Sequence, residues 1–256
     1  TTFYVQIGNP DATAYAAGAT YGSRNVWSSN YKYVGHLQNV YTDSTSNSNH
    51  GSVGGSPTFV TGKVGGKAMS VTGDGSQFSI PAAAMAHTGT FSLWANVQGD
   101  GTPDGGGTVS VANSATDSRT RLNRLNSGGK TYTYIKGNPS ISVASIASVV
   151  GQWTKLTCTW IPTSGSNGTA NFYVNGALLG SGTYTDVTTA TAIMRVGSFG
   201  SYGALSGGFN GYIDEVRLTN DVLSAARELT NYNNQNSPST FYSVENLSVV
   251  NINKPT

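Results

Sequence analysis

Short runs of alternating apolar and polar residues fill most of this sequence, and Gly, Asn, Ser and Thr separate them. A period of two residues places successive side chains on opposite faces of a β-strand, so this pattern predicts a sandwich or a barrel. The β-branched and aromatic residues that favour strands dominate the runs. The predicted strands are Tyr33 to Leu37, Ala68 to Thr72, Phe78 to Ile80, Thr90 to Val97, Thr108 to Ala112, Thr131 to Ile135, Thr154 to Ile161, Ala170 to Val174, Ile193 to Val196 and Gly211 to Leu218.

Two local signals are sharper than the rest. Asn175-Gly176 lies between apolar runs and tolerates the positive φ angles of a type I′ turn, which predicts a two-residue hairpin. Ser224 can cap a helix from Ala225 to Tyr232, and the pair Asn233-Asn234 is expected to end it. One short helix near the C-terminus is therefore predicted.

Other segments are polar or lie outside this pattern. The stretch from Thr42 to Gly51 is rich in turn residues and predicts a loop, as does the Gly-rich stretch from Gly197 to Gly208. After Pro238, the runs Phe241 to Val244 and Leu247 to Ile252 predict a terminal strand pair or a linker.

Composition narrows the possible functions. The 256 residues carry 14 basic and 12 acidic side chains, a net charge of +2, which provides no general field for nucleic acid or an anionic membrane. No stretch has the length of apolar residues that a membrane span needs, so we expect no membrane insertion. Cys158 is the only cysteine, which excludes an internal disulfide and a cysteine-cluster metal site.

Four motifs, in order, resemble the laminin-G-like domains, which are concanavalin A-like jelly rolls. They are Gly62 to Val71, Gly89 to Trp94, Gln152 to Thr157 followed by Phe172 to Gly176, and Phe209 to Leu218 with Leu223 to Ala225 behind it. The resemblance covers residues 42–236 and implies an all-β, two-sheet antiparallel jelly roll sandwich. Residues 1–41 resemble the end of a small domain that precedes this jelly roll in bacterial surface and phage proteins. They are expected to lead into the sandwich or pack on it, with residues 237–256 as a C-terminal strand pair or linker.

Some laminarinase-like glycosidases share this fold, so hydrolysis has to be weighed. Their carboxylate pair lies on one strand as Glu-x-Asp-x-x-Glu, where alternation places both acids on one face. This chain has only Glu215, Glu228 and Glu245, and no two of them fit that motif. No nucleophile elbow appears, and His36, His50 and His87 are scattered. We therefore expect no enzyme, and a glycoside hydrolase is the weaker alternative.

Asp214 is the carboxylate that most needs explanation. Strict alternation would place it on one face with Tyr212, Val216 and Leu218, and a carboxylate facing a core must be paired, hydrogen-bonded or bound to a cation. The resemblance implies a structural Ca²⁺ at the matching position, with a second acid from an early loop, for which Asp43 is the candidate. Oxygen ligands suit Ca²⁺. The alternative is that Asp214 accepts backbone or Tyr hydrogen bonds.

Carbohydrate binding on a sandwich needs exposed aromatic rings and hydrogen-bonding groups. Phe199 and Tyr202 in the Gly-rich stretch are candidate platforms, and the alternative is that they cover the end of the sandwich. Arg121 belongs to a basic stretch that could meet an acidic polysaccharide or form a solvated strand face. We expect no nucleic-acid site, because spaced arginines without interleaved aromatics match none of the usual modules.

These observations lead to two functional hypotheses. The first is a non-catalytic carbohydrate-binding or adhesion module of a bacterial or phage surface protein, with a glycan or cell-surface polysaccharide as partner. The second is a structural subunit of a virion, fibre or extracellular filament that uses the jelly roll for self-assembly or contacts with virion partners. Both place the chain outside the cell, on a cell surface or on a virion, and fold alone does not separate them.

Overall fold

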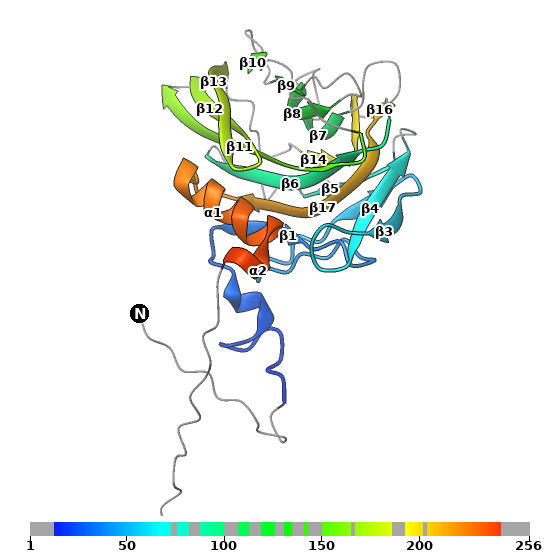
Figure 1. The fold of residues 1–256 in the computed structure, drawn as a ribbon, viewed down its shortest axis with the longest axis vertical. Helices are drawn as coiled ribbons and strands as arrows, with labels where there is room; N and C mark the ends of the chain where they lie inside the picture. Colours follow the sequence, from blue (N-terminus) through cyan, green and yellow to red (C-terminus); the bar gives the residue numbers. More distant parts are fainter. Residues whose placement is uncertain are drawn as a thin grey trace, which may run out of the picture.

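The computed structural model describes residues 13–72, 76–81, 88–99, 107–112, 119–125, 131–134, 141–142, 150–164, 167–185, 193–201 and 204–241. In these residues the chain forms two antiparallel sheets, a separate two-stranded hairpin and two α-helices. Figure 1 shows a long curved sheet with the second sheet on one side of it and both helices on the other. The predicted all-β, two-sheet antiparallel jelly roll is confirmed.

We call the larger sheet A. Its order is β13 (Ala177–Thr185), β12 (Asn167–Val174), β11 (Trp153–Ser164), β6 (Gly89–Val97), β17 (Asn210–Thr219), β4 (Lys67–Thr72) and β3 (Thr58–Thr61), and β1 (Tyr31–Gly35) also pairs with β17. Strand β11 runs further than predicted, through Pro162 to Ser164. The proline is tolerated because pairing with β6 ends at Trp160, so Pro162 has only β12 beside it.

We call the smaller sheet B. Its order is β10 (Ile141–Ser142), β9 (Thr131–Tyr134), β8 (Arg119–Leu125), β7 (Gly107–Ala112), β14 (Ile193–Val196), β5 (Gln77–Ile80) and β2 (Ser52–Gly54). The Gly-rich stretch predicted as a loop is instead a hairpin of β15 (Ser198–Ser201) and β16 (Ala204–Gly208). Glycine permits this because a strand needs no side chain to satisfy its backbone hydrogen bonds.

The core lies between the two sheets and follows the predicted alternation. In β6, Phe91, Leu93, Ala95 and Val97 are buried in it, while the residues between them face outward from sheet A. Cys158 of β11 is also a core residue, and burial raises the pKa of its thiol to about 12. A neutral thiol is a poor nucleophile, which agrees with a packing role.

Helix α1 (Ala225–Asn236) covers part of the outer face of sheet A (Figure 1). The Ser224 side chain accepts a hydrogen bond from the backbone N–H of Arg227, which is the predicted cap. The predicted end at Asn233-Asn234 is wrong, because α1 continues for another turn and the side chain of Gln235 bonds to sheet A. Tertiary contact here overrides the weak helix propensity of asparagine.

The ends of the described chain differ in part from expectation. Strand β1 joins sheet A beside β17, with Tyr33 and Val34 completely buried, and a 3₁₀-helix, η1 (Ser23–Val26), precedes it. A second helix, α2 (Pro238–Phe241), occupies the start of the predicted C-terminal strand pair. Proline fits the first turn of a helix because its missing N–H has no partner there. The remaining residues of that prediction lie outside the described part.

Candidate functional site

A β-bulge at Asp214 and Glu215 interrupts β17 and decides where its side chains face. Glu215 has φ +50°, and the register with β6 shifts between Asp214 and Arg217. Before the bulge Ile213 belongs to the core and Asp214 shares the outer face with Tyr212; after it, Val216 belongs to the core. The prediction that Asp214 shares a face with Val216 and Leu218 is therefore wrong, because the bulge adds one residue and reverses the alternation.

The same bulge separates two partners of β17. Residues before it pair with β4, and residues after it pair with β1. Asp214 fills this junction: its Oδ2 accepts hydrogen bonds from the backbone N–H groups of Lys63 and Val64 at 2.8 and 2.9 Å, and its Oδ1 accepts one from Glu215 at 2.8 Å. Burial raises the pKa of Asp214 to about 7, although the three N–H groups partly offset that rise.

Asp43 organises the loop from Thr42 to Gly51. Its Oδ1 accepts from the backbone N–H groups of Val34 and Thr45 at 3.0 and 2.9 Å. Its Oδ2 accepts from the Thr45 hydroxyl at 2.8 Å and the Asn49 N–H at 2.9 Å. The backbone N–H of Asp43 itself donates to Nδ1 of His50. This polar segment is held in place by one buried carboxylate.

These surroundings do not fit a calcium site at Asp43 and Asp214. Every carboxylate oxygen of the two residues already accepts from N–H or O–H groups, and the two residues hold separate sets of donors. A Ca²⁺ site needs six to eight converging oxygen atoms, whereas N–H groups present their positive ends. The described residues also contain no group of three or more His, Cys, Asp or Glu side chains that could hold a metal. Both carboxylates fit the alternative, that of hydrogen-bond acceptors.

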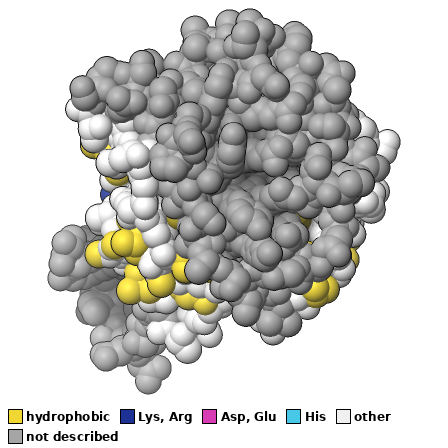
Figure 2. Space-filling model, turned by 90° about the horizontal axis from the view of Figure 1, so that it is seen from above, with side chains coloured by type: hydrophobic (Ala, Val, Ile, Leu, Met, Phe, Trp, Pro, Cys, Tyr) yellow, Lys and Arg dark blue, Asp and Glu magenta, His cyan; other side chains and the backbone are white. Residues whose placement is uncertain are grey.

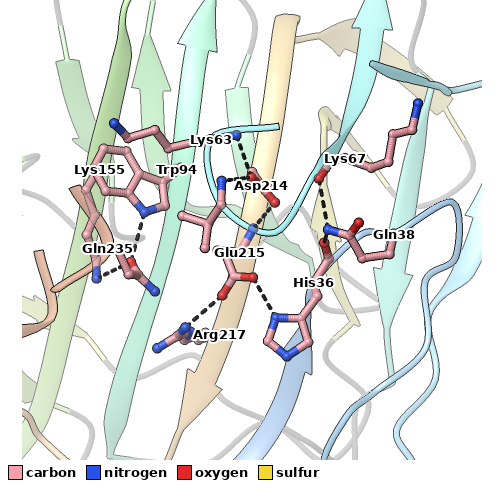
Figure 3. Close-up of polar contacts among 11 residues, drawn as sticks. His36, Gln38, Lys63, Lys67, Trp94, Lys155, Asp214, Glu215, Arg217 and Gln235 are labelled. Carbon is pink, nitrogen blue, oxygen red and sulfur yellow. Dashed lines mark hydrogen bonds and ion pairs between the residues drawn. The ribbon is translucent and has the colours of Figure 1, made fainter. Parts of the chain in front are cut away.

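Glu215 lies at the centre of a buried ion pair network that the sequence did not predict. Its Oε1 contacts Nδ1 of His36, and its Oε2 accepts from Arg217 at 2.7 Å (Figure 3). Burial alone would raise the pKa of Glu215, but the hydrogen bond from His36 and the charge of Arg217 outweigh it and hold that pKa below its usual value. The Arg217 guanidinium also lies 5.1 Å from the ring centre of Trp27. The network attaches the segment around β1 to β17.

A second polar layer lies beneath α1. Oε1 of Gln235 accepts from the Trp94 indole N–H at 2.8 Å and from the Lys155 ammonium at 3.0 Å (Figure 3). Burial lowers the pKa of Lys155 to about 8. Glu228 is buried on the same helix, 1% exposed. These side chains are covered by the helix, so their arrangement anchors α1 rather than offering a surface to a ligand.

Beyond the end of α1, the outer face of sheet A carries one further row. Trp153 of β11 pairs with Asn96 of β6, and Asn96 pairs on its other side with Tyr212 of β17. The two rings meet above the amide, with centroids 6.4 Å apart and planes at 44°. Both rings are partly exposed. Strict alternation assigned Tyr212 to the core face together with Asp214, and the predicted strand began after Trp153. Only the pairing register therefore places the three residues together on the outer face.

Of the residues predicted to bind a ligand, the two in described strands lie elsewhere. Phe199 belongs to β15 and Arg121 to β8, which lie outside sheet A, and nothing is described of their side chains. Tyr202 lies outside the described residues. These three predictions remain predictions. On the face seen in Figure 2, the described hydrophobic side chains form separate groups rather than one extended surface.

The two antiparallel sheets and the C-terminal helix define a jelly roll sandwich. A sequence model of the Concanavalin A-like lectin/glucanases superfamily matches residues 72–227, and the chain belongs to this superfamily. No curated protein matches the chain. No helix in the described part is both long enough and apolar enough to cross a membrane.

Several solved structures share the fold. Domain 4 of AbnA, an extracellular arabinanase of Geobacillus stearothermophilus solved with arabinotriose, is 23% identical with a TM-score of 0.59, over 78% of this chain and 96% of that domain. The binding domain of Paraclostridial Mosquitocidal Protein 1 is 15% identical with a TM-score of 0.57, over 80% of this chain and 52% of the other. Trypanosoma rangeli sialidase is 14% identical with a TM-score of 0.56, over 82% of this chain and 33% of the enzyme. At these identities the likeness shows the fold alone.

Proposed function

We propose that this chain is a non-catalytic carbohydrate-binding module of an extracellular, cell-surface or virion protein. The observation that carries the proposal is the match to domain 4 of AbnA, a separate domain solved with a bound oligosaccharide and covered over 96% of its length. That domain is one part of a larger hydrolase, which fits a module that binds sugar while another part of the protein acts on it.

The acidic residues described here support a binding role. Glu215 is held by His36 and Arg217, Glu228 of α1 is buried, and Asp221 accepts a hydrogen bond from Asn30. Asp43 and Asp214 accept hydrogen bonds from the backbone. A glycosidase needs two carboxylates facing a shared space at a separation of roughly 5 to 10 Å, one of them free to donate a proton. Each of these five carboxylates in the described part of the chain is instead buried in the fold or bonded to it.

A glycan array tests this function directly. We expect selective binding to a small group of oligosaccharides, and no release of reducing sugar when the same oligosaccharides are incubated with the protein. An array without any selective signal would reject carbohydrate binding. Release of sugar that tracks the purified protein would show that the module is an enzyme.

One observation favours the structural subunit as a second candidate. Strand β13 ends sheet A, and its Leu178 and Leu179 side chains are 54% and 38% exposed. An edge strand with exposed apolar residues can pair with another chain. Light scattering at rising protein concentration distinguishes this role. The average mass of the particles increases with concentration for a filament subunit, whereas it stays constant for a binding module.

A further inference from the structure

We infer that the row Trp153–Asn96–Tyr212, on the outer face of sheet A, is the site where this module binds a neutral oligosaccharide through the apolar faces of its sugar rings. This inference rests on the proposed function and specifies where on the chain it is carried out. The first argument is geometric. Three adjacent strands hold the three residues in register, and the two rings contact each other at a centroid distance of 6.4 Å, so a ligand would meet a platform that is already assembled.

The second argument is the chemistry of the row. Sugar rings present C–H faces that pack on aromatic rings and hydroxyl groups that need donors and acceptors. The Trp153 indole N–H and the Tyr212 hydroxyl have no hydrogen-bond partner among the described residues, whereas the indole N–H of the nearby Trp94 donates to Gln235. Two partly exposed rings, whose polar ends bond to none of the described residues, therefore lie on the outer face of sheet A.

The third argument is the support beneath the rings. Asn96 is 5% exposed, and its Nδ2 donates to the carbonyl of Gly151 at 3.1 Å while its Oδ1 accepts from Gln98 at 2.7 Å. These bonds tie the strand β6 to the segment before Trp153. Gln98 itself is exposed, so it can keep this bond through Nε2 and still present its Oε1 to a ligand hydroxyl. A buried, bonded amide under two rings makes the platform rigid, which polar recognition requires.

The charge around the row sets the class of sugar. The carboxylate nearest along β17, Asp214, is fully buried and engaged with backbone N–H groups. The Lys63 ammonium lies 5.1 Å from the ring centre of Trp94, one row away, where it covers that ring. Among the described residues, apolar rings and amides thus dominate this row, and this favours a neutral oligosaccharide. The basic stretch at Arg121 would instead favour an acidic one.

The test compares variants of this row with variants elsewhere on an array of neutral and sialylated oligosaccharides, with arabinotriose as a soluble probe. Trp153→Ala and Tyr212→Ala should each weaken the affinity for neutral sugars about tenfold or more, because each removes one stacking surface. Tyr212→Phe should retain most of the affinity, since it keeps the ring. Melting curves confirm that each variant is folded.

Two sets of controls make the outcomes distinct. Tyr15→Ala and Tyr21→Ala remove an exposed tilted pair with centroids 5.8 Å apart, which lies outside the sheets, and should leave affinity unchanged. Phe199→Ala and Arg121→Ala probe the sites predicted from sequence. If both row variants still bind, the row is not the binding site, although the proposed function stands. The same conclusion follows if the protein is selective for sialylated sugars and loses this binding with Arg121→Ala. If the unmodified protein binds no oligosaccharide, the proposed function and the proposed binding site are both rejected.

Discussion

At the scale of residues, Asp214 and Glu215 are neighbours in sequence whose ionisation has opposite effects on stability. Burial raises the pKa of Asp214 to about 7, above its value in the unfolded chain, so its contribution to stability is complete below about pH 4 and is lost as pH rises through 7. Glu215 has a lowered pKa despite burial, because His36 and Arg217 favour its charged form. Its contribution is present above its unfolded pKa and is lost as pH falls below it.

The opposite pKa shifts of Asp214 and Glu215 predict that each residue makes the unfolding free energy depend on pH in a different pH range. Asp214→Asn should flatten the decline in unfolding free energy between about pH 4 and 7, since Asn does not titrate. Glu215→Gln should reduce the loss of stability below about pH 4. Urea unfolding at half-unit pH steps measures both. An unchanged slope between pH 4 and 7 in Asp214→Asn would show that Asp214 is already charged throughout that range.

Asp43 should contribute to stability through the backbone groups it satisfies. Asp43→Ala removes the acceptor of three N–H groups, those of Val34, Thr45 and Asn49. We expect the unfolding free energy to fall by about 2–4 kcal/mol, because buried donors left without partners are costly. Ser46→Ala, in the same loop but exposed, is the control and should change little. Urea unfolding of the two variants makes the comparison.

The donor sets of Asp43 and Asp214 also predict the response to calcium. Neither excess Ca²⁺ nor a chelator should shift the melting temperature, because the N–H groups at both carboxylates oppose a cation. If Ca²⁺ did bind, a free concentration a hundred times the dissociation constant would raise the free energy of unfolding by about 2.7 kcal/mol. A rise of several degrees with calcium, abolished by Asp214→Asn, would restore the metal site that the resemblance implies.

At the scale of elements, the hairpin between β12 and β13 is coupled to α1. Asn175 and Gly176 have φ of +50° and +78°, as the predicted type I′ turn requires. A Cβ on Gly176 would lie 2.9 Å from the Cα of Leu229 and 3.0 Å from the Cβ of Tyr232. Glycine at this turn therefore serves both the backbone conformation and the approach of the helix.

A matched pair of substitutions separates these two roles. Gly151 also has a positive φ, +86°, but a Cβ there would meet nothing within 4 Å. Gly151→Ala should cost about 1 kcal/mol, from the backbone conformation alone. Gly176→Ala should cost clearly more, about 2–4 kcal/mol, because α1 must also move. Chemical denaturation gives the difference, and equal losses would mean that α1 does not press on the turn.

At the scale of the whole molecule, the sandwich extends beyond the stretch matched to the superfamily. The match begins at residue 72, yet β1 pairs with β17 and brings Tyr33 and Val34 into the protein interior. His36, which follows β1, pairs with Glu215. The folding unit therefore includes the segment around β1.

Two truncations test this boundary. A chain beginning at residue 23 keeps η1 and β1, and its melting temperature should stay within a few degrees of the full chain. A chain beginning at residue 37 loses two buried core side chains and the partner of Glu215. It should melt at least about 10 °C lower or aggregate, since losses of several kcal/mol are expected in a domain of this size. Equal melting temperatures would place the boundary after β1.

The sequence by itself determined the class of fold, because alternation, β-branched residues and turn dipeptides act over a few neighbouring positions. The strands at Ala68 to Thr72 and Ile193 to Val196, the Asn175-Gly176 turn and the Ser224 cap are examples. Helix α1 was placed correctly at its start and wrongly at its end. Its last turn depends on Gln235 reaching Trp94 and Lys155, residues far away in the chain.

Only the tertiary structure decided the chemistry of the outer face. Alternation assigned Asp214 to the same face as Val216. The bulge at Glu215 places these two residues on opposite faces, and no sequence rule predicts the positive φ that Glu215 adopts there. The same holds for Trp153 and Tyr212, which are 59 positions apart in the printed sequence and meet over Asn96 only through strand register. Register is set by the packing of the whole sheet, so a pattern read along one strand cannot contain it.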